Sequence, residues 1–189
     1  MKRLSILFLL FMVSSCKTVY NKVNGVNKNI SFSSIKEYKT HVSTKTKLDT
    51  DKFYFVDNND YNNFLGNILN QNIVYYYGLV KNKKIVASGS NLKEKSSCYG
   101  AISDYIQNNY TNDESNIKSK ISDFSYYNFD EEKAELNFNK EVLVFIYSYK
   151  LGKLSNNLEN LINDIEQNIN IDYIILSLDN VDIKTKIQY

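Results

Sequence analysis

The chain has 189 residues, which is enough for one domain with its own hydrophobic core and a short extension. Its 23 Lys and Arg against 21 Asp and Glu give a formal charge of +2, and Arg3 is the only arginine, which argues against phosphate-handling enzymes and nucleic-acid-binding proteins. One histidine and two cysteines are too few for the usual zinc site, and we expect no metal and no cofactor.

The first sixteen residues have the order of features found in a bacterial export signal. Two cationic residues come first, an apolar run from Leu4 to Val13 follows, and two serines precede Cys16. A run of about ten residues is too short to cross ~30 Å of hydrocarbon. The segment Val13-Ser14-Ser15-Cys16 resembles the lipobox of bacterial lipoproteins. This resemblance implies cleavage before Cys16, a diacylglyceryl thioether on the Cys16 sulfur and acylation of the new amino group.

The lipobox resemblance implies that the membrane is a partner, because palmitate or similar acyl chains on Cys16 would hold the protein at the cell envelope. Two or three chains give stable anchoring, at about 0.8 kcal/mol per buried CH₂. Lys17 follows the cysteine, and no acidic cluster does. By similarity to sorting patterns in bacteria with two membranes, this favours an outer-membrane lipoprotein that faces the periplasm. In a bacterium with one membrane, the same protein would face the exterior.

Removal of residues 1–15 as a signal peptide leaves 174 residues with 21 lysines and 21 acids, a formal charge of zero. This balance gives no argument for nucleic acid or anionic lipid as a partner. Because Cys16 would be a thioether, Cys98 would be a lone thiol, and no disulfide could form within the mature chain.

Residues 16–50 are expected to comprise the lipidated cysteine and a flexible tether, since apolar residues there are scattered among Lys, Asn, Ser and Thr. A tether of ~30 residues would span about 30 Å on average. Within it, residues 30–42 could instead form an ordered lead-in strand or turn. Residues 51–189 would then form the globular domain.

The sequence of the first part of the domain predicts a strand, a helix and a hairpin. The strand is expected over residues 53–56. The helix is predicted by apolar residues at helical spacing: Tyr61, Phe64, Leu65, Ile68 and Leu69. Residues 73–80 and 84–88 are β-rich runs around a polar turn, which predicts a hairpin with Asn82 in the left-handed conformation.

A further helix is expected from Ser96 or Ser97, a loop that could contain a helical turn over residues 110–128, and an edge strand over Lys133–Asn137. Residues 141–149 and 172–178 are predicted to be buried strands on either side of a helix that begins at Ser155. Together these elements predict a single α+β domain with a mixed sheet, a β-hairpin, a C-terminal βαβ unit and three main helices.

The C-terminal strand, helix and strand resemble the opening of thioredoxin-like redoxin domains. Redoxins place a reactive cysteine just after the first strand, where this chain has residues 149–153, which contain no cysteine. The resemblance therefore implies a degenerate relative of these redoxins.

Two groups of residues are candidates for function. Cys98 is expected in the first turn of a helix with Lys93 and Lys95 upstream, which favours the thiolate. His41 is the one histidine that could assist it, and the alternative is that Cys98 packs as a small apolar side chain.

Tyr75, Tyr76 and Tyr77 place aromatic rings on both faces of a strand. Either some of them form a binding surface, or the sheet has a second packed layer. Two oxygen-rich segments, residues 57–60 and 179–182, are explained by turn and cap roles.

We identify no catalytic residues in the sequence. The expected function is a non-catalytic binding or interaction module on a lipid anchor, with an envelope protein or a ligand as its partner. The alternative is an envelope enzyme, or a degenerate thioredoxin-like protein, that uses Cys98.

Overall fold

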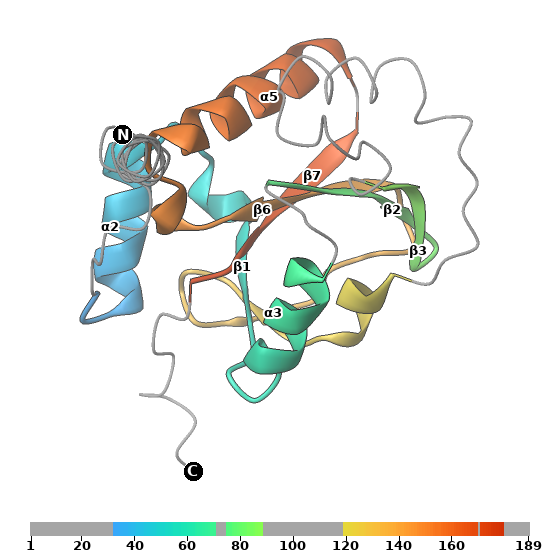
Figure 1. The fold of residues 1–189 in the computed structure, drawn as a ribbon, viewed down its shortest axis with the longest axis horizontal. Helices are drawn as coiled ribbons and strands as arrows, with labels where there is room; N and C mark the ends of the chain where they lie inside the picture. The colour runs from blue at the N-terminus through green and yellow to red at the C-terminus, as the bar shows by residue number, and fades with distance from the viewer. Residues whose placement is uncertain (1–31, 71–74, 89–118, 170, 180–189) are drawn as a thin grey trace, which may run out of the picture.

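The computed structural model describes residues 32–70, 75–88, 119–169 and 171–179. Within these ranges, three α-helices pack against a seven-stranded mixed sheet, which confirms the predicted α+β class (Figure 1). The helices are α2 (Ile35–Lys45), α3 (Tyr61–Leu69) and α5 (Ser155–Asn168), with 3-10 turns η1 (Thr50–Lys52), η3 (Lys120–Asp123) and η4 (Tyr149–Leu154). The strands are β1 (Phe53–Val56), β2 (Tyr76–Lys81), β3 (Lys84–Ser88), β4 (Tyr126–Tyr127), β5 (Lys133–Ala134), β6 (Val142–Tyr147) and β7 (Asp172–Ser177).

The sheet has the strand order β3-β2-β6-β7-β1-β4-β5. Its centre is parallel, because β7 pairs in parallel with both β6 and β1, and the outer strands pair antiparallel. The parallel pair β6 and β7 joined by α5 is the predicted βαβ unit. The hairpin β2–β3 is also confirmed, with Asn82 and Lys83 both at positive φ, as the tightest hairpin turns require.

Both faces of the central strands are buried. One face carries α2 and α5, whose side chains pack with Phe53, Phe145 and Ile175. The opposite face carries α3 and η3, which pack with Val144, Ile146 and Leu176 (Figure 1). Strands covered on both sides are apolar at nearly every position, which is why β6 and β7 appear as continuous apolar runs in the sequence.

The structure corrects the tether expected over residues 16–50, and the lead-in strand or turn considered for residues 30–42. Residues 35–45 form α2, and its side chains Ile35, Tyr38 and Val42 are buried against the sheet. At its start the Ser34 hydroxyl accepts a hydrogen bond from the Glu37 N–H at 3.2 Å. The folded domain therefore includes residues well before the expected boundary at residue 51, because α2 supplies part of the core.

Several predictions fall outside the described residues. These are the export signal with Cys16, the helix expected from Ser96 or Ser97 with Cys98, and the first part of the loop expected over residues 110–128. In the part of the chain that the structure describes, no helix has the length and apolar character needed to cross a membrane.

Candidate functional site

The carboxyl ends of the three parallel strands lie along one edge of the sheet. Each strand is followed there by a polar side chain: Ser148 after β6, Asp179 after β7 and Asp57 after β1. In open sheets with parallel strands, ligands usually bind beyond these ends. This edge is therefore the first candidate for a functional site.

Asp179 is the centre of a buried hydrogen-bond network at this edge. Its Oδ2 accepts from the Tyr38 hydroxyl at 2.5 Å and from the Tyr149 N–H at 2.8 Å. Its Oδ1 accepts from the Ser148 hydroxyl at 2.6 Å. The Ser177 hydroxyl completes the group, because it lies 3.2 Å from the Tyr38 hydroxyl and accepts from the Asp179 N–H at 3.1 Å.

Burial dominates the electrostatics of this network. Desolvation raises the pKa of Asp179 above its usual value, although the hydrogen bonds from Ser148, Tyr38 and Tyr149 and the charge of Lys150 oppose that rise. Burial, followed by the nearby Asp179 charge, raises the pKa of Tyr38 well above its usual value. The same two causes raise the pKa of Tyr147. Both tyrosines therefore stay protonated at physiological pH, and the Tyr38 hydroxyl donates its proton to the hydrogen bond with Asp179.

The geometry supports a structural role for Asp179. Both carboxylate oxygens already accept hydrogen bonds, and the residue is only 7% exposed. The donors come from α2 and from the turn after β6, so the carboxylate ties α2 to the ends of β6 and β7. A general base would need an oxygen that can reach a substrate proton.

The neighbouring segments complete this edge with turn and cap contacts. The Tyr61 hydroxyl on α3 donates to the Leu178 carbonyl at 2.6 Å. Asp57 Oδ1 accepts from the Asn59 N–H at 2.9 Å, which is the turn role expected for residues 57–60. Asp60 precedes α3, but its side chain makes no capping hydrogen bond. Among the described residues, no group of three or more His, Cys, Asp or Glu side chains could hold a metal ion.

The structure overturns the binding surface predicted for Tyr75, Tyr76 and Tyr77. All three are buried, at 1%, 2% and 0% exposure, and they contribute to the packed layers on both sides of the sheet. The Tyr76 ring packs against Phe145 with centroids 5.8 Å apart, and the Tyr77 hydroxyl lies 3.4 Å from that of Ser119. The second packed layer, the alternative considered for these residues, is therefore what the fold contains.

His41 lies on α2 beside Phe32, with ring centroids 5.1 Å apart. Burial and then the charge of Lys45 lower its pKa, while Asp179 opposes this shift. Cys16 and Cys98 lie outside the described residues, so a partnership between His41 and Cys98 stays a prediction.

Sequence reasoning missed the network because its members are far apart in the chain. Tyr38 and Asp179 are separated by 141 residues, and Tyr38 fell in the expected tether. A usable signal was present, since Asp179 closely follows the apolar run Tyr173–Leu176 of one buried strand and Ser148 follows the neighbouring strand. Polar residues at those two positions predict proximity wherever the two strands are parallel neighbours.

Comparisons with known proteins found no matching family model, no similar curated protein and no similar solved structure.

Proposed function

We propose that the chain is a lipid-anchored protein of the bacterial cell envelope, and that its domain is a non-catalytic binding or interaction module. The observation that carries this proposal is the N-terminal order of cations, apolar run, two serines and Cys16. A lipid on Cys16 would hold the domain close to the bilayer, because only fifteen residues lie between Cys16 and Phe32. Even fully extended, that stretch reaches no more than about 58 Å.

The hydrogen bonding of Asp179 supports the proposal that the domain is non-catalytic. This carboxylate is engaged on both oxygens and fixes α2, so it is better suited to stability than to proton transfer. Since Tyr75, Tyr76 and Tyr77 are buried, a partner would have to contact another part of the domain.

Lipidation can be tested by growing cells with radiolabelled palmitate and separating the protein between detergent and aqueous phases. We expect label in the wild-type protein and in the Cys98→Ser control, and none in Cys16→Ser. Detergent partitioning should fall with the label, because the acyl chains supply the apolar surface. An unlabelled wild-type protein, or a Cys16→Ser variant that partitions unchanged, would contradict the proposal.

Thiol alkylation tests the enzymatic alternative. A catalytic thiolate reacts quickly in the folded protein at neutral pH, whereas a thiol that only packs reacts quickly after denaturation. We expect slow alkylation of Cys98 in the native protein and fast alkylation in denaturant. Fast native alkylation that also depends on His41, as judged by the His41→Gln variant, would favour the enzyme instead.

A further inference from the structure

We infer that α2 and η4 form a membrane-facing surface that binds the anionic headgroups of the bilayer to which the protein is anchored. We call this the α2–η4 surface and define it by its exposed lysines Lys36, Lys45, Lys150 and Lys153. The inference rests on the proposed lipid anchor for its orientation. It concerns a separate contact, made by the folded domain itself.

The first observation is that the formal charge of zero in the mature chain hides a strong separation along the sequence. Residues 17–48 contain seven lysines and one acid, Glu37, a formal charge of +6. Residues 49–189 contain 14 lysines and 20 acids, a formal charge of −6. The basic part is the part nearest Cys16, so the charge that attracts an anionic membrane lies next to the expected point of attachment.

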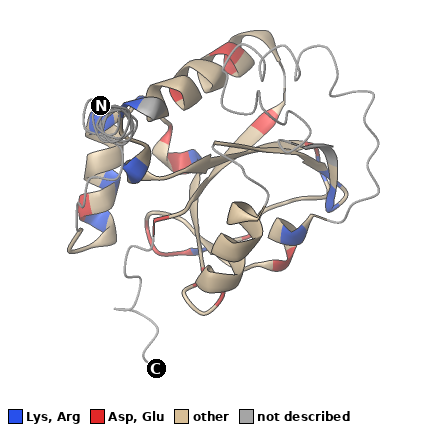
Figure 2. Cartoon of the chain, viewed as in Figure 1, with Lys and Arg blue, Asp and Glu red and all other residues tan. Residues whose placement is uncertain are grey.

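The second observation is spatial. Elements α2 and η4 lie side by side, because the Phe32 ring at the start of α2 packs on Tyr149 at 5.3 Å and Tyr38 shares Asp179 with the Tyr149 N–H. Figure 2 shows their lysines gathered on the same side of the molecule. Among the described residues, no carboxylate lies within 4.0 Å of any of the four ammonium groups. Their charge is therefore available to an external anion.

Three acids on or beside α2 already have partners within the fold. Glu37 Oε2 accepts hydrogen bonds from the Ser33 N–H at 2.7 Å and the Ser33 hydroxyl at 2.6 Å. Asp130 pairs with Lys39 at 3.3 Å, and Asp179 is buried beneath α2. The half-buried Tyr149 ring lies beside Lys150, whose Nζ is 5.9 Å from the ring centroid, and Phe32 packs on the same ring. Basic residues together with aromatic ones are typical of surfaces that bind at the headgroup boundary.

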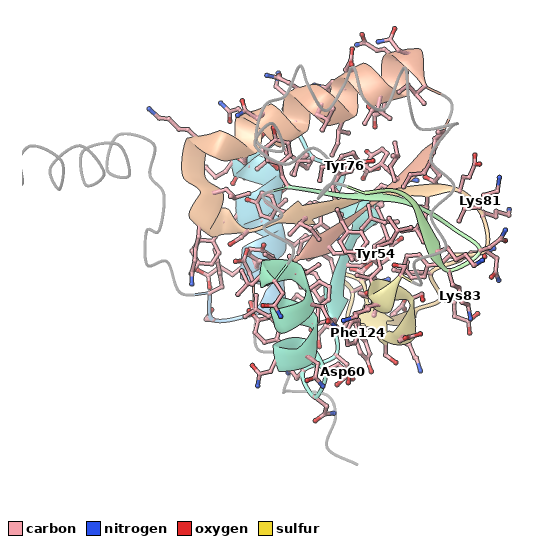
Figure 3. The ribbon with its side chains drawn as sticks, turned by 45° about the vertical axis from the view of Figure 1, so that its right-hand side comes forward. Tyr54, Asp60, Tyr76, Lys81, Lys83 and Phe124 are labelled. Carbon is pink, nitrogen blue, oxygen red and sulfur yellow. The ribbon has the colours of Figure 1, made fainter. Side chains whose placement is uncertain are left out.

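A second set of lysines serves as an internal control. Lys83, Lys120 and Lys140 are exposed, and backbone hydrogen bonds join the first of these to Ser119 and Phe138. These three lysines lie at or near the β2–β3 turn. Figure 3 labels Lys81 and Lys83 at this turn, on the opposite side of the molecule from α2. If the α2–η4 surface faces the bilayer, these distal lysines face away from it.

The test uses the full lipidated protein and lysine acetylation read by mass spectrometry. The protein is reconstituted on vesicles of phosphatidylcholine alone and on vesicles of phosphatidylcholine mixed with phosphatidylglycerol. An anionic surface near −30 mV enriches protons about threefold, so nearby amines react at least about threefold more slowly. We expect that slowing for the four lysines of the α2–η4 surface on anionic vesicles at low salt, its loss at high salt, and no change at the distal lysines.

Equal slowing of both lysine sets, or no slowing of either, would overturn the inference. Failure of the anchor gives a different result, because a protein without acyl chains would not sediment with phosphatidylcholine vesicles at all. In that case the α2–η4 surface, if correct, would still make the protein sediment with anionic vesicles at low salt.

Charge-removal variants give a second readout. Each lysine near an anionic surface contributes about fivefold in affinity. In the triple variant Lys36→Gln, Lys45→Gln, Lys153→Gln, the remaining lysine of the surface, Lys150, should be acetylated at the same rate on the two vesicle types. The matched control Lys83→Gln, Lys120→Gln, Lys140→Gln should keep the acetylation difference between the two vesicle types. The opposite pattern would place the membrane contact at the β2–β3 turn and contradict the inference.

Discussion

At the scale of single residues, Asp179 shows how a fold can accommodate a buried carboxylate. Removing a carboxylate from water is costly unless hydrogen-bond donors replace the lost solvent. Here a tyrosine on α2, a serine and a backbone N–H beside β6 supply three donors. Because these donors come from distant parts of the chain, the network forms only when α2, β6 and β7 are all in place.

The Tyr38→Phe substitution tests this structural role. It removes one donor while keeping the buried ring, and we expect a loss of about 1–3 kcal/mol in the free energy of unfolding, measured by urea denaturation. Tyr54→Phe is the matched control. Tyr54 is half-buried, and its hydroxyl makes no hydrogen bond with any of the described residues. Equal stability of the two variants would show that the Tyr38 hydroxyl contributes nothing.

The raised pKa of Asp179 gives a pH prediction with a definite sign. An unfolded aspartate has a pKa of about 3.9, and burial raises the folded value above this. The native state therefore binds the proton more tightly, and this contribution to stability is lost as pH rises through the folded pKa. Compared with Asp179→Asn, the wild-type protein should lose free energy of unfolding as pH rises from below about 4 toward neutrality. Parallel pH profiles in denaturant titrations would contradict this.

At the scale of elements, local pattern predicted most of the sheet and missed one helix. Strands β6 and β7, helices α3 and α5 and the β2–β3 hairpin follow from apolar periodicity and turn residues. Helix α2 was missed because its mean composition is polar, although Ser34 and Glu37 have capping-box spacing. The strand order and the Asp179 network depend on contacts between distant segments, which periodicity does not encode.

A substitution at Val42 separates a docked helix from a tether. Val42 is fully buried on α2, and Val42→Ala removes two methyl groups from the core. We expect a loss of about 1–3 kcal/mol in the free energy of unfolding. Ser43→Ala, at an exposed position of the same helix, should change stability by less than about 0.5 kcal/mol. If denaturation midpoints of both variants match the wild type, α2 does not belong to the cooperative unit.

Two glycines should respond in opposite directions to the same change. Gly152 in η4 has φ 56° and ψ −132°, a conformation that side chains disfavour, so Gly152→Ala should cost about 1–3 kcal/mol. Gly66 lies in α3, and no atom lies within 4 Å of the place that an added methyl group would take, so Gly66→Ala should gain up to about 1 kcal/mol. Thermal unfolding of the pair measures both shifts. If the Gly152→Ala substitution stabilised the protein, η4 would not need a residue that readily adopts a positive φ at this position.

At the scale of the whole molecule, the proposed anchor and the charge separation along the sequence would act together. The lipid alone would hold the domain near the bilayer without fixing its orientation. A basic end next to the anchor and an acidic remainder would turn α2 and η4 toward an anionic surface, and the rest of the domain away from it. The short sequence separation between Cys16 and Phe32 would strengthen this effect, since a short connection keeps the local concentration of the surface at the membrane high.

If the α2–η4 surface depends on its closeness to the anchor, then lengthening the segment between Cys16 and Phe32 should weaken its contact with the membrane. Inserting about fifteen Gly and Ser residues between Asn24 and Gly25 doubles the length of the connection, since fifteen residues join Cys16 to Phe32. Effective concentration falls as about the −3/2 power of length, so the contact between the α2–η4 surface and anionic vesicles should weaken about threefold. Acetylation of the lysines on the α2–η4 surface should rise accordingly, while the urea midpoint stays unchanged because the insertion precedes the folded domain. If acetylation does not respond to the insertion, the surface binds the bilayer independently of the tether, and proximity to the anchor is not what positions it.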